Sequence, residues 1–502
     1  MASKNNKKIV SGYPLLFGYL GIFLMMIGAV MATPVLSLIF YKNDYKYIHY
    51  FLIPAGISVF VGFILYLLVF KKEKGKLLKN QEMVLLNLIW LAAFLIGALP
   101  FLFYNKTNFS LALFESISGF TSTGLTVFNP ETLPPIFNLY RSIMLLFGGI
   151  GLVLVLSSAI SSRHGQLIYQ AEGHNNQFLP NLLKGARWIL GIYFYLIFIG
   201  TLLFIIFNMS PFEAINHSIA CISNGGFSTK INNIAGYNSI PIEIIAMILM
   251  ILGSTSFFIF VQIIKGDFKK IFKNSELVYS LVNFAIVFFL VYIVLIFNAK
   301  YSPANALRFG LFQYISAQTT SGAQNVDFLN KLPQFLLYIL MIKMISGGQI
   351  GSAGGGVKQY RIVYIIKGIW YSILKSFKTE RTIQTKYINI LGQKVVYEEQ
   401  EFIKHLVFLF IYLGSIVSGT FIIMAFGYNF LEASFEFISA IGTAGLSLGI
   451  TEKAAASNHL ILWILMFGMY IGRLEIMPVI YGGKRVLYDI FHKKHKQVIF
   501  ND

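Results

Sequence analysis

Long apolar stretches are the strongest constraint on how this chain can fold. Stretches of the roughly 20 apolar residues that a helix needs to cross a bilayer begin near residues 14, 47, 83, 186, 239, 274, 332, 401 and 457. A tenth stretch, residues 136–160, is interrupted by Gly148, Gly149 and Gly151. Within lipid, a helix satisfies its own backbone hydrogen bonds. The sequence therefore predicts an all-α integral membrane protein with about ten membrane spans.

Composition excludes several other classes of protein. The chain is 56% hydrophobic and 12% charged, whereas a typical soluble protein is about 25% charged. Its single cysteine, Cys221, cannot form a disulfide framework or a multi-cysteine metal site within one chain. The net charge of +19 lies in short Lys and Arg runs between apolar stretches, as in cytoplasmic membrane loops. We therefore expect a lipid membrane, and no nucleic acid, as the partner of these charges.

Four shorter apolar stretches fall between the long ones, at residues 108–120, 211–223, 303–319 and 429–441. Each is too short to cross the bilayer, so we expect it to enter and leave on the same side. Basic runs occur at residues 71–79, 265–273, 375–404 and 484–496. These runs share one side only if every short stretch dips in from the other side. Both termini are therefore expected in the cytoplasm.

A repeated motif organises most of the chain. FESISGFTSTGL (114–125), FQYISAQTTSGA (312–323) and FEFISAIGTAGL (435–446) align without gaps, and INHSIACISNGG (215–226) fits the same frame more loosely. This register aligns Gly124, Gly225, Gly322 and Gly445. We expect four copies of helix, re-entrant pore helix, glycine turn and helix in a pseudo-fourfold arrangement around one pore. The predicted units are an N-terminal two-helix unit, 1–80, and four pore repeats, 81–165, 166–272, 273–385 and 386–502.

The glycine turns are the candidate ion site. Non-helical backbone at membrane depth leaves carbonyl oxygens without partners unless it lines a wet cavity or binds an ion. Four such turns around one axis would give rings of carbonyl oxygens that replace the hydration shell of a monovalent cation. A divalent cation would want several carboxylates, which these turns lack. The expected carbonyl ligands are Thr123, Gly124, Asn224, Gly225, Ser321, Gly322, Ala444 and Gly445.

Residues 347–356 form the candidate gate. Six of these ten residues are glycine, namely Gly347, Gly348, Gly351, Gly354, Gly355 and Gly356. At about 1 kcal/mol per glycine, a regular helix is disfavoured here. We expect a mobile plug that gives up its backbone hydrogen bonds and borders water, with Gln349 and Ser352 bonding across a wet vestibule. Lys358 would anchor it at the cytoplasmic surface.

Arg473 is an intramembrane charge, which is costly and marks function by default. We expect it to place positive charge beneath the glycine turns, and the alternatives are a pair with Glu475 or an Arg that snorkels to the surface. Glu115 and Glu436 either cap their short helices or attract cations. His217 is more readily explained by helix packing. The G-x-S-x-G match around Ser447 lies in a repeat turn without a hydrolase sheet, which makes nucleophilic catalysis remote.

These motifs together resemble the Trk/Ktr/HKT superfamily of potassium transporters. The residues that carry the resemblance are the turns TSTGL, SNGGFST, TTSGA and GTAGL, the segment GGQIGSAGGGVK (347–358) and GRLEI (472–476). The two extra N-terminal helices look like the bacterial Trk branch, with its TrkH-like pore subunit. The resemblance spans essentially the whole chain and departs from the family at Ala323, where third-repeat members often carry an aromatic residue.

The resemblance implies potassium uptake across a bacterial cytoplasmic membrane, with K⁺ as transported ion, no organic cofactor and no enzymatic activity. It also implies a homodimer with one pore per subunit and a cytoplasmic ring of nucleotide-binding, TrkA-like regulatory subunits. The glycine-rich segment would be the gate below the selectivity filter, and Arg473 would approach the pore. The alternative function is a secondary transporter that couples Na⁺ or H⁺ to K⁺, which shares the repeats.

Overall fold

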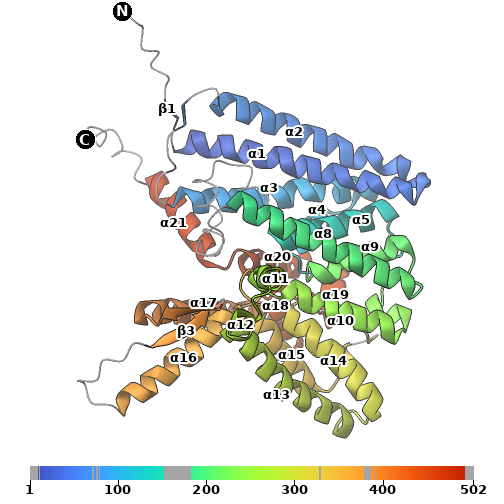
Figure 1. The fold of residues 1–502 in the computed structure, drawn as a ribbon. Coiled ribbons are helices and arrows are strands. Elements are labelled where there is room, and N and C mark those ends of the chain that lie inside the picture. The colour runs from blue at the N-terminus through green and yellow to red at the C-terminus, as the bar shows by residue number, and fades with distance from the viewer. Residues whose placement is uncertain are drawn as a thin grey trace, which may run out of the picture.

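The computed structural model describes residues 9–10, 12–70, 73–74, 77, 80–151, 182–326, 329–377, 386–390 and 392–491. Helices make up most of it (Figure 1), as predicted for an all-α membrane protein. The strands that it describes form two small sheets: β1 (Ile9–Val10) pairs in parallel with β2 (Glu73–Lys74), and β3 (Tyr387–Ile390) pairs antiparallel with β4 (Gln393–Val396). The β3–β4 hairpin was not expected from the sequence.

An N-terminal helix pair precedes the rest. It consists of α1 (Tyr13–Ala32) and α2 (Ile48–Phe70), joined by the 3-10 helices η1 (Thr33–Ile39) and η2 (Lys42–Tyr47). The two helices touch through small residues, because a Cβ atom on Gly21 would overlap Gly62 and one on Gly28 would overlap the backbone of Ala55. Close backbone approach through small residues is a common way for helices to associate in lipid.

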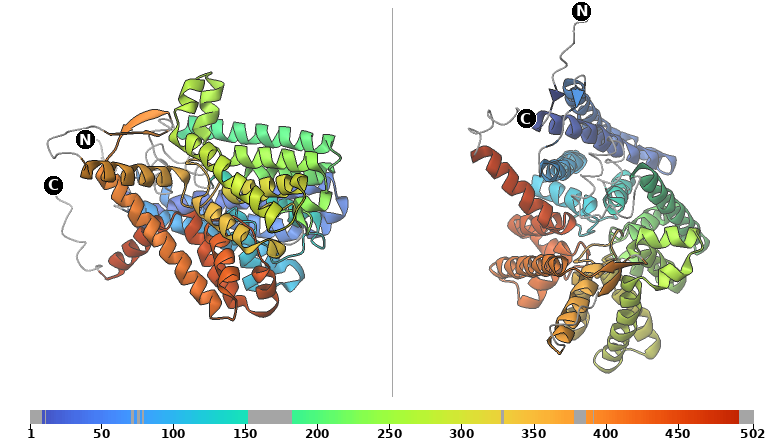
Figure 2. Two further views of the ribbon diagram at one scale, coloured as in Figure 1. Left: turned by 90° about the horizontal axis from the view of Figure 1, so that it is seen from below. Right: turned by 60° about the vertical axis from the view of Figure 1, so that its left-hand side comes forward.

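Four times, a long helix leads into a short helix, a tight turn and a second helix. The long helices are α3 (Gln81–Phe103), α8 (Leu182–Ile206), α13 (Ser275–Phe297) and α17 (Glu399–Met424). The short helices are α4 (Phe109–Phe120), α9 (Pro211–Ile222), α14 (Pro303–Thr319) and α18 (Phe430–Ile441). The four sets follow one another around a centre in the right-hand view of Figure 2.

Each short helix begins where its sequence provides an N-cap. The side chains of Asn108, Ser210, Ser302 and Asn429 each accept a hydrogen bond from a backbone N–H in the first turn. Such caps typically contribute about 1 kcal/mol to helix stability. The observed ends lie within two residues of the four predicted re-entrant stretches.

The second helices are broken or end early. The sequence indicated an interruption in the first set, at Gly148, Gly149 and Gly151, and in the third set, but not in the second and fourth. In the second set, α10 (Ile240–Ser254) meets α11 (Phe257–Ile264) at 97°, and in the fourth, α20 (His459–Arg473) meets α21 (Met477–Phe491) at 100°. In the third, the glycine-rich segment separates α15 (Gln334–Ser346) from α16 (Gln359–Ser376). In the first, α5 (Pro135–Ile150) ends at Gly151, which has a positive φ of 92°.

Short helices complete the described structure. They are α12 (Phe268–Phe272), α19 (Ile450–Ser457), η3 (Tyr104–Lys106), η5 (Asn233–Tyr237) and η6 (Leu329–Lys331). Among the predictions, residues 152–160 of the tenth apolar stretch, the boundary at 165/166, residue 385 and the tail from 492 onward lie outside the described residues.

Several helices have the length and apolar surface of membrane spans. Six described helices are long and apolar enough to cross a bilayer, or up to eight if each bent pair counts as one span. Their outer faces expose large apolar side chains, with Phe60 64%, Phe289 61% and Phe410 76% exposed. A lipid bilayer covers such faces in place of water. The protein is therefore a multi-pass membrane protein.

One end of the molecule gathers several of the segments that were predicted to share a side. Tyr13 at the start of α1 donates a 2.9 Å hydrogen bond to Asp489 near the end of α21. β1, before α1, pairs with β2, which follows α2. Gly392 in the β3–β4 hairpin packs against the backbone of Lys270 in α12.

Candidate functional site

Each short helix ends in the same kind of turn. The residue after the helix, or the next one, has a positive φ although it is not glycine: Ser122 (52°), Asn224 (48°), Thr320 (54°) and Thr443 (49°). An L-residue in this conformation costs roughly 1–2 kcal/mol. Local strain of this kind persists only where the surrounding structure over-determines it.

Equivalent backbone hydrogen bonds fix the register of the four turns. Each bond runs from the residue after the strained one back to a carbonyl in the short helix: Thr123 to Ser118 (2.9 Å), Gly225 to Ala220 (3.0 Å), Ser321 to Ser316 (2.9 Å) and Ala444 to Ser439 (2.8 Å). Gly225 thus occupies the position of Thr123, Ser321 and Ala444. The glycine equivalent to Gly124, Gly322 and Gly445 is Gly226.

The predicted alignment of the second repeat was therefore wrong by one residue. Asn224 is equivalent to Ser122, and the predicted pair Asn224 and Gly225 becomes Gly225 and Gly226. In this register the residue of the second repeat that is equivalent to Glu115 is His217. The second repeat lacks the Phe that begins the other three motifs, and it carries two adjacent glycines. Both possible alignments therefore placed a glycine at the equivalent position of the turn. The backbone bond from Gly225 to Ala220 distinguishes the frames.

The four equivalent glycines form a closed ring of backbone contacts. A Cβ atom on Gly124 would overlap Gly226, one on Gly226 would come within 3.0 Å of Gly322, one on Gly322 would overlap Ala444 and Gly445, and one on Gly445 would overlap Thr123. Gly124, Gly322 and Gly445 also have positive φ values of 89°, 74° and 80°. The ring thus excludes side chains for steric reasons at all four positions, and for conformational reasons at three.

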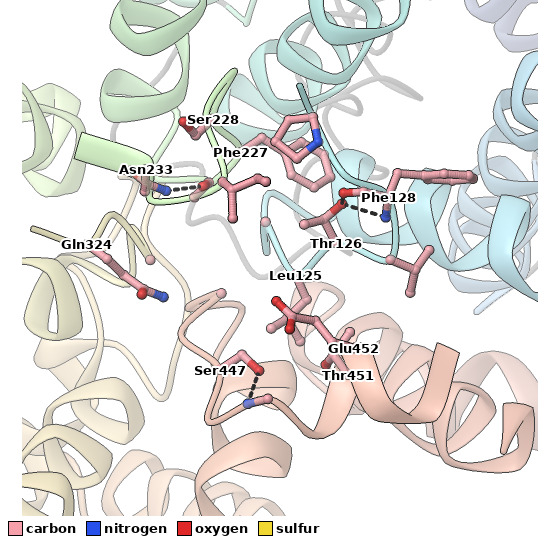
Figure 3. Close-up of a pocket in the computed structure, with 18 of the residues that line it drawn as sticks. Leu125, Thr126, Phe128, Phe227, Ser228, Asn233, Gln324, Ser447, Thr451 and Glu452 are labelled. Carbon is pink, nitrogen blue, oxygen red and sulfur yellow. Dashed lines mark hydrogen bonds between the residues drawn. The ribbon is translucent and has the colours of Figure 1, made fainter. Parts of the chain in front are cut away.

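The ring opens on one side into a cavity of about 590 Å³ lined by residues of all four sets. Figure 3 shows Thr126, Ser228, Gln324 and Ser447 around this space. A second, much smaller cavity of about 40 Å³ is lined by Thr443, by the glycine-rich segment and by Arg473. Thr443 precedes the ring residue Gly445 by two positions, so the fourth turn runs from the small cavity to the large one.

Several buried polar groups in the turns have no protein partner within the described ranges. They are the Ser122 and Ser321 hydroxyls and both side-chain polar atoms of Asn224. Buried polar groups are satisfied in almost all proteins by protein, water or an ion. These turns thus combine strained backbone, close glycine contacts and buried polar groups at one place.

The glycine-rich segment lies directly against the turns of the third and fourth sets. Gly355 donates a 2.7 Å backbone hydrogen bond to the Thr320 hydroxyl. A Cβ atom on Gly355 would overlap Thr443 and Gly442, and one on Gly354 would lie 3.0 Å from the Thr319 carbonyl. The sequence predicted that this segment would not be helical, and the structure confirms it.

The segment keeps many of its hydrogen bonds, contrary to expectation. Gln349 and Ala353 donate backbone bonds of 3.2 and 3.1 Å to the carbonyls of Ser254 and Gly253, at the break of the second set. Ile350 donates a 3.0 Å bond to the carboxylate of Glu276 in α13. The carbonyls at the break between α10 and α11 thus accept hydrogen bonds that a regular helix would have satisfied within itself. The sequence of the glycine-rich segment alone could not predict these partners, because they belong to another set.

The polar side chains of the segment also act differently from the prediction. The Gln349 side chain accepts a 3.0 Å bond from the backbone of Ser256, and the Ser352 hydroxyl donates a 2.6 Å bond to the Gln349 carbonyl. Both side chains are buried. Lys358 folds back and bonds the Gly354 carbonyl instead of anchoring at the surface. These groups fix the segment in one conformation.

Arg473 links three helix breaks. It donates hydrogen bonds to the Gly148 carbonyl at the end of α5 and, at 3.3 Å, to the Ala353 carbonyl in the glycine-rich segment. Glu475, the partner considered from the sequence, forms an ion pair with Arg361 of α16. The Arg473 guanidinium thus lines the small cavity and bonds backbone carbonyls at two of these breaks.

Glu115 and Glu436 are fully buried and hold the backbone beyond the turns. Glu115 accepts a 3.1 Å bond from the Val127 N–H, and Glu436 accepts the equivalent 3.1 Å bond from Leu448. Ser447, the serine of the G-x-S-x-G match, donates a 2.8 Å bond to Glu436 and so belongs to this support.

Sequence reasoning missed three charged residues nearby, namely Arg141, Glu243 and Glu276. All three are at most 2% exposed and bond to the turns or to the glycine-rich segment. Arg141 and Glu243 interrupt otherwise apolar second helices, and that interruption was the available signal.

Comparisons with known proteins agree with this arrangement. The family model of TrkH cation transport proteins matches residues 57–484. An uncharacterised cation transporter of Methanocaldococcus jannaschii is 29% identical over 92% of this chain and 93% of its own length. The Trk system potassium uptake protein TrkH of Escherichia coli K12 is 27% identical over 82% of this chain and 86% of its own.

A solved structure has the same fold. The crystal structure of the potassium transporter TrkH from Vibrio parahaemolyticus superimposes with a TM-score of 0.80 at 25% identity, covering 93% of this chain and 98% of that one. The family match, the similarity to relatives over most of their lengths and the shared fold all support the same family assignment. This chain belongs to the TrkH family of cation transport proteins.

Proposed function

We propose that this protein takes up potassium ions through a pore between the four helix sets, and that the four turns are its selectivity filter. The observation that carries the proposal is the closed ring of Gly124, Gly226, Gly322 and Gly445 between a large and a small cavity. Backbone carbonyls of such turns can replace the hydration shell of K⁺. The potassium uptake named for the Escherichia coli relative supports the choice of ion.

The proposed carbonyl ligands are Thr123, Gly124, Gly225, Gly226, Ser321, Gly322, Ala444 and Gly445. We take the sets to be the four repeats, 81–165, 166–272, 273–385 and 386–502, after an N-terminal unit, 1–80. The end that carries the start of α1 and the end of α21 is the cytoplasmic one, since the basic runs of its loops follow the positive-inside rule. We place the protein in a bacterial cytoplasmic membrane, as the family resemblance implies.

The glycine-rich segment and Arg473 form the gate in this proposal. Gly347, Gly348, Gln349, Gly351, Ser352, Gly354, Gly355 and Gly356 lie in the segment, which packs on the cytoplasmic end of the filter. A homodimer with cytoplasmic nucleotide-binding subunits, as the family resemblance implies, would shift this segment by differential contact. Deleting Gly351 to Gly355 should give a pore that conducts without those subunits. A folded dimeric deletion variant that remains closed would place the gate elsewhere.

Tracer flux tests the transport activity itself. Purified protein in liposomes loaded with K⁺ should accumulate ⁸⁶Rb⁺ from outside as K⁺ leaves and sets an inside-negative potential, and liposomes loaded with Na⁺ should accumulate little. Empty liposomes are the control. Equal uptake in both would reject a pathway that selects K⁺ over Na⁺.

The alternative is a secondary transporter that couples Na⁺ or H⁺ to K⁺. The bent pairs α10–α11 and α20–α21 favour this alternative, because broken helices recur in such transporters. A Na⁺ or pH gradient imposed at equal K⁺ on both sides should drive K⁺ movement only through a coupled transporter. A simple pore should show no net flux.

A further inference from the structure

A buried ion pair within the first set lies beside the glycine ring and contacts the second set through Arg141. Arg141 Nε in α5 lies 2.7 Å from Glu115 Oε1 in α4, and their side chains are 1% and 0% exposed. Breaking one partner of such a pair leaves an uncompensated buried charge, so both residues are tightly constrained. The sequence separates them by a turn and a loop, and only the fold brings them together.

Glu115 controls the backbone just beyond Gly124. Its carboxylate accepts bonds from the Thr126 hydroxyl at 2.9 and 3.1 Å and from the Val127 N–H at 3.1 Å. Thr126 follows the ring glycine by two residues. A carboxylate with three protein donors has little freedom to move, so it fixes the exit of the first turn.

Arg141 controls the same position in the second set. Its Nη1 donates to the Ser228 carbonyl at 3.2 Å, and its guanidinium lies 4.1 Å from the Phe227 ring centre. Nη1 also bonds the Asn138 side chain at 3.0 Å. Ser228 follows the ring glycine Gly226 by two residues. The planar guanidinium therefore joins the backbones that leave Gly124 and Gly226.

A similar link occurs between the second and third sets. Glu243 in α10 accepts a 2.9 Å bond from Asn325, which in turn accepts a 3.1 Å bond from Gln313, the residue equivalent to Glu115. Asn325 follows Gly322 by three residues. In both places a charged residue of one second helix reaches the turn of the next set. Support at the outer ends of adjacent turns is thus a repeated feature of the fold.

We propose that Arg141 and Glu115 are positioning residues for ion discrimination, which set the spacing of the ring between Gly124 and Gly226. The proposal rests on the proposed potassium function. Selectivity depends on the size and rigidity of the carbonyl cage, and the turns are strained enough to relax when their support is removed. Neither residue needs to touch the ion.

The test is the permeability ratio of Na⁺ to K⁺ in planar bilayers, measured from the reversal potential of purified variants. Arg141→Met should raise this ratio about threefold or more, because the turns can then relax toward smaller ions. Arg141→Lys keeps the charge but loses the fork that joins Glu115 to Ser228, so its ratio should lie between those of the wild type and Arg141→Met. The ratio does not depend on how much protein is active.

A double variant covers the case in which a single charge left behind prevents folding. Glu115→Gln with Arg141→Met removes both charges, which proteins often tolerate, and it should raise the ratio as well. Glu401→Gln breaks an exposed pair with Lys404 (40% and 67% exposed) and should leave the ratio unchanged.

Unchanged ratios in the variants that conduct, even with lowered thermal midpoints, would make the pair merely structural and overturn the proposal. If the wild type itself fails to conduct K⁺, the proposed function falls, and this inference falls with it.

Discussion

The backbone of Gly445 packs against the carbonyl oxygen of Thr123, so that the fourth turn touches the first. This contact closes a ring that the chain builds from segments far apart in the sequence. Closure leaves no room for a Cβ atom at any of the four ring positions. In the second set, the residue at the ring position is Gly226.

Gly226→Ala should therefore disturb ion selection, whereas Gly225→Ala should be tolerated better. A Cβ atom on Gly226 would lie 2.9 Å from the Gly322 carbonyl, whereas the nearest atoms to one on Gly225 belong to the Leu145 side chain, which can shift more easily than backbone. We expect Gly226→Ala to raise the Na⁺-to-K⁺ permeability ratio several-fold or to abolish K⁺ flux. The opposite ranking of the two variants in liposome flux would restore the register expected from the sequence.

The sequence predicted the elements of the fold better than their contacts. Apolar length and the repeated Phe and Ile-Ser positions located the short helices to within two residues, because each of these signals is local. The register of the second turn was one residue off, since two adjacent glycines satisfy either frame. The bond between Gly225 and Ala220 and the contacts of Gly226 with Gly124 and Gly322 distinguish the two frames.

Features that depend on contacts between distant segments could not be predicted. The helices α10 and α20 end in bends at Thr255 and at Leu474. The composition around these residues would also permit a continuous helix, so it did not predict the bends. The glycine-rich segment was expected to give up its hydrogen bonds, yet Ser254 and Gly253 accept them. The supports of the turns, such as Arg141 with Glu115, also join residues that no periodicity connects.

Arg473→Ala should increase K⁺ flux through folded protein by about five- to tenfold, or about 1–1.4 kcal/mol of barrier. The guanidinium lines the small cavity below Thr443 and bonds the Ala353 carbonyl, so its removal lowers a positive barrier and loosens the segment. Arg473→Lys keeps the charge and should change flux less. Rates measured per folded protein that stay equal or fall in Arg473→Ala would count against this role.

Glu276→Ala should raise flux in the absence of regulatory subunits. The Glu276 carboxylate accepts the Ile350 N–H at 3.0 Å and so holds the glycine-rich segment. Removing a buried acceptor costs about 1–3 kcal/mol, which destabilises the position that the segment occupies in this structure. Glu276→Gln retains an acceptor oxygen and should conduct more like the wild type. Indistinguishable fluxes for the alanine and glutamine variants would remove Glu276 from the gate.

Gly28→Leu should destabilise the protein without changing its selectivity. The added side chain would collide with Ala55 and Val59 of α2, and overpacking of this kind typically costs 1–3 kcal/mol. Gly56→Leu is the matched control, because a Cβ atom there meets nothing within 4 Å. Thermal unfolding in detergent should show a lower midpoint for the first variant only. A changed permeability ratio in Gly28→Leu would mean that the helix pair acts on the pore.

The most direct test of the central claim is the reversal potential of the purified protein in a planar bilayer. With a tenfold K⁺ gradient and Na⁺ balancing the charge, a potassium-selective ring predicts a reversal potential close to the K⁺ equilibrium value, about 59 mV per tenfold gradient. That value should not move when the pH or the Na⁺ gradient is changed. A reversal potential near zero, or one that follows Na⁺ or pH, would contradict the account.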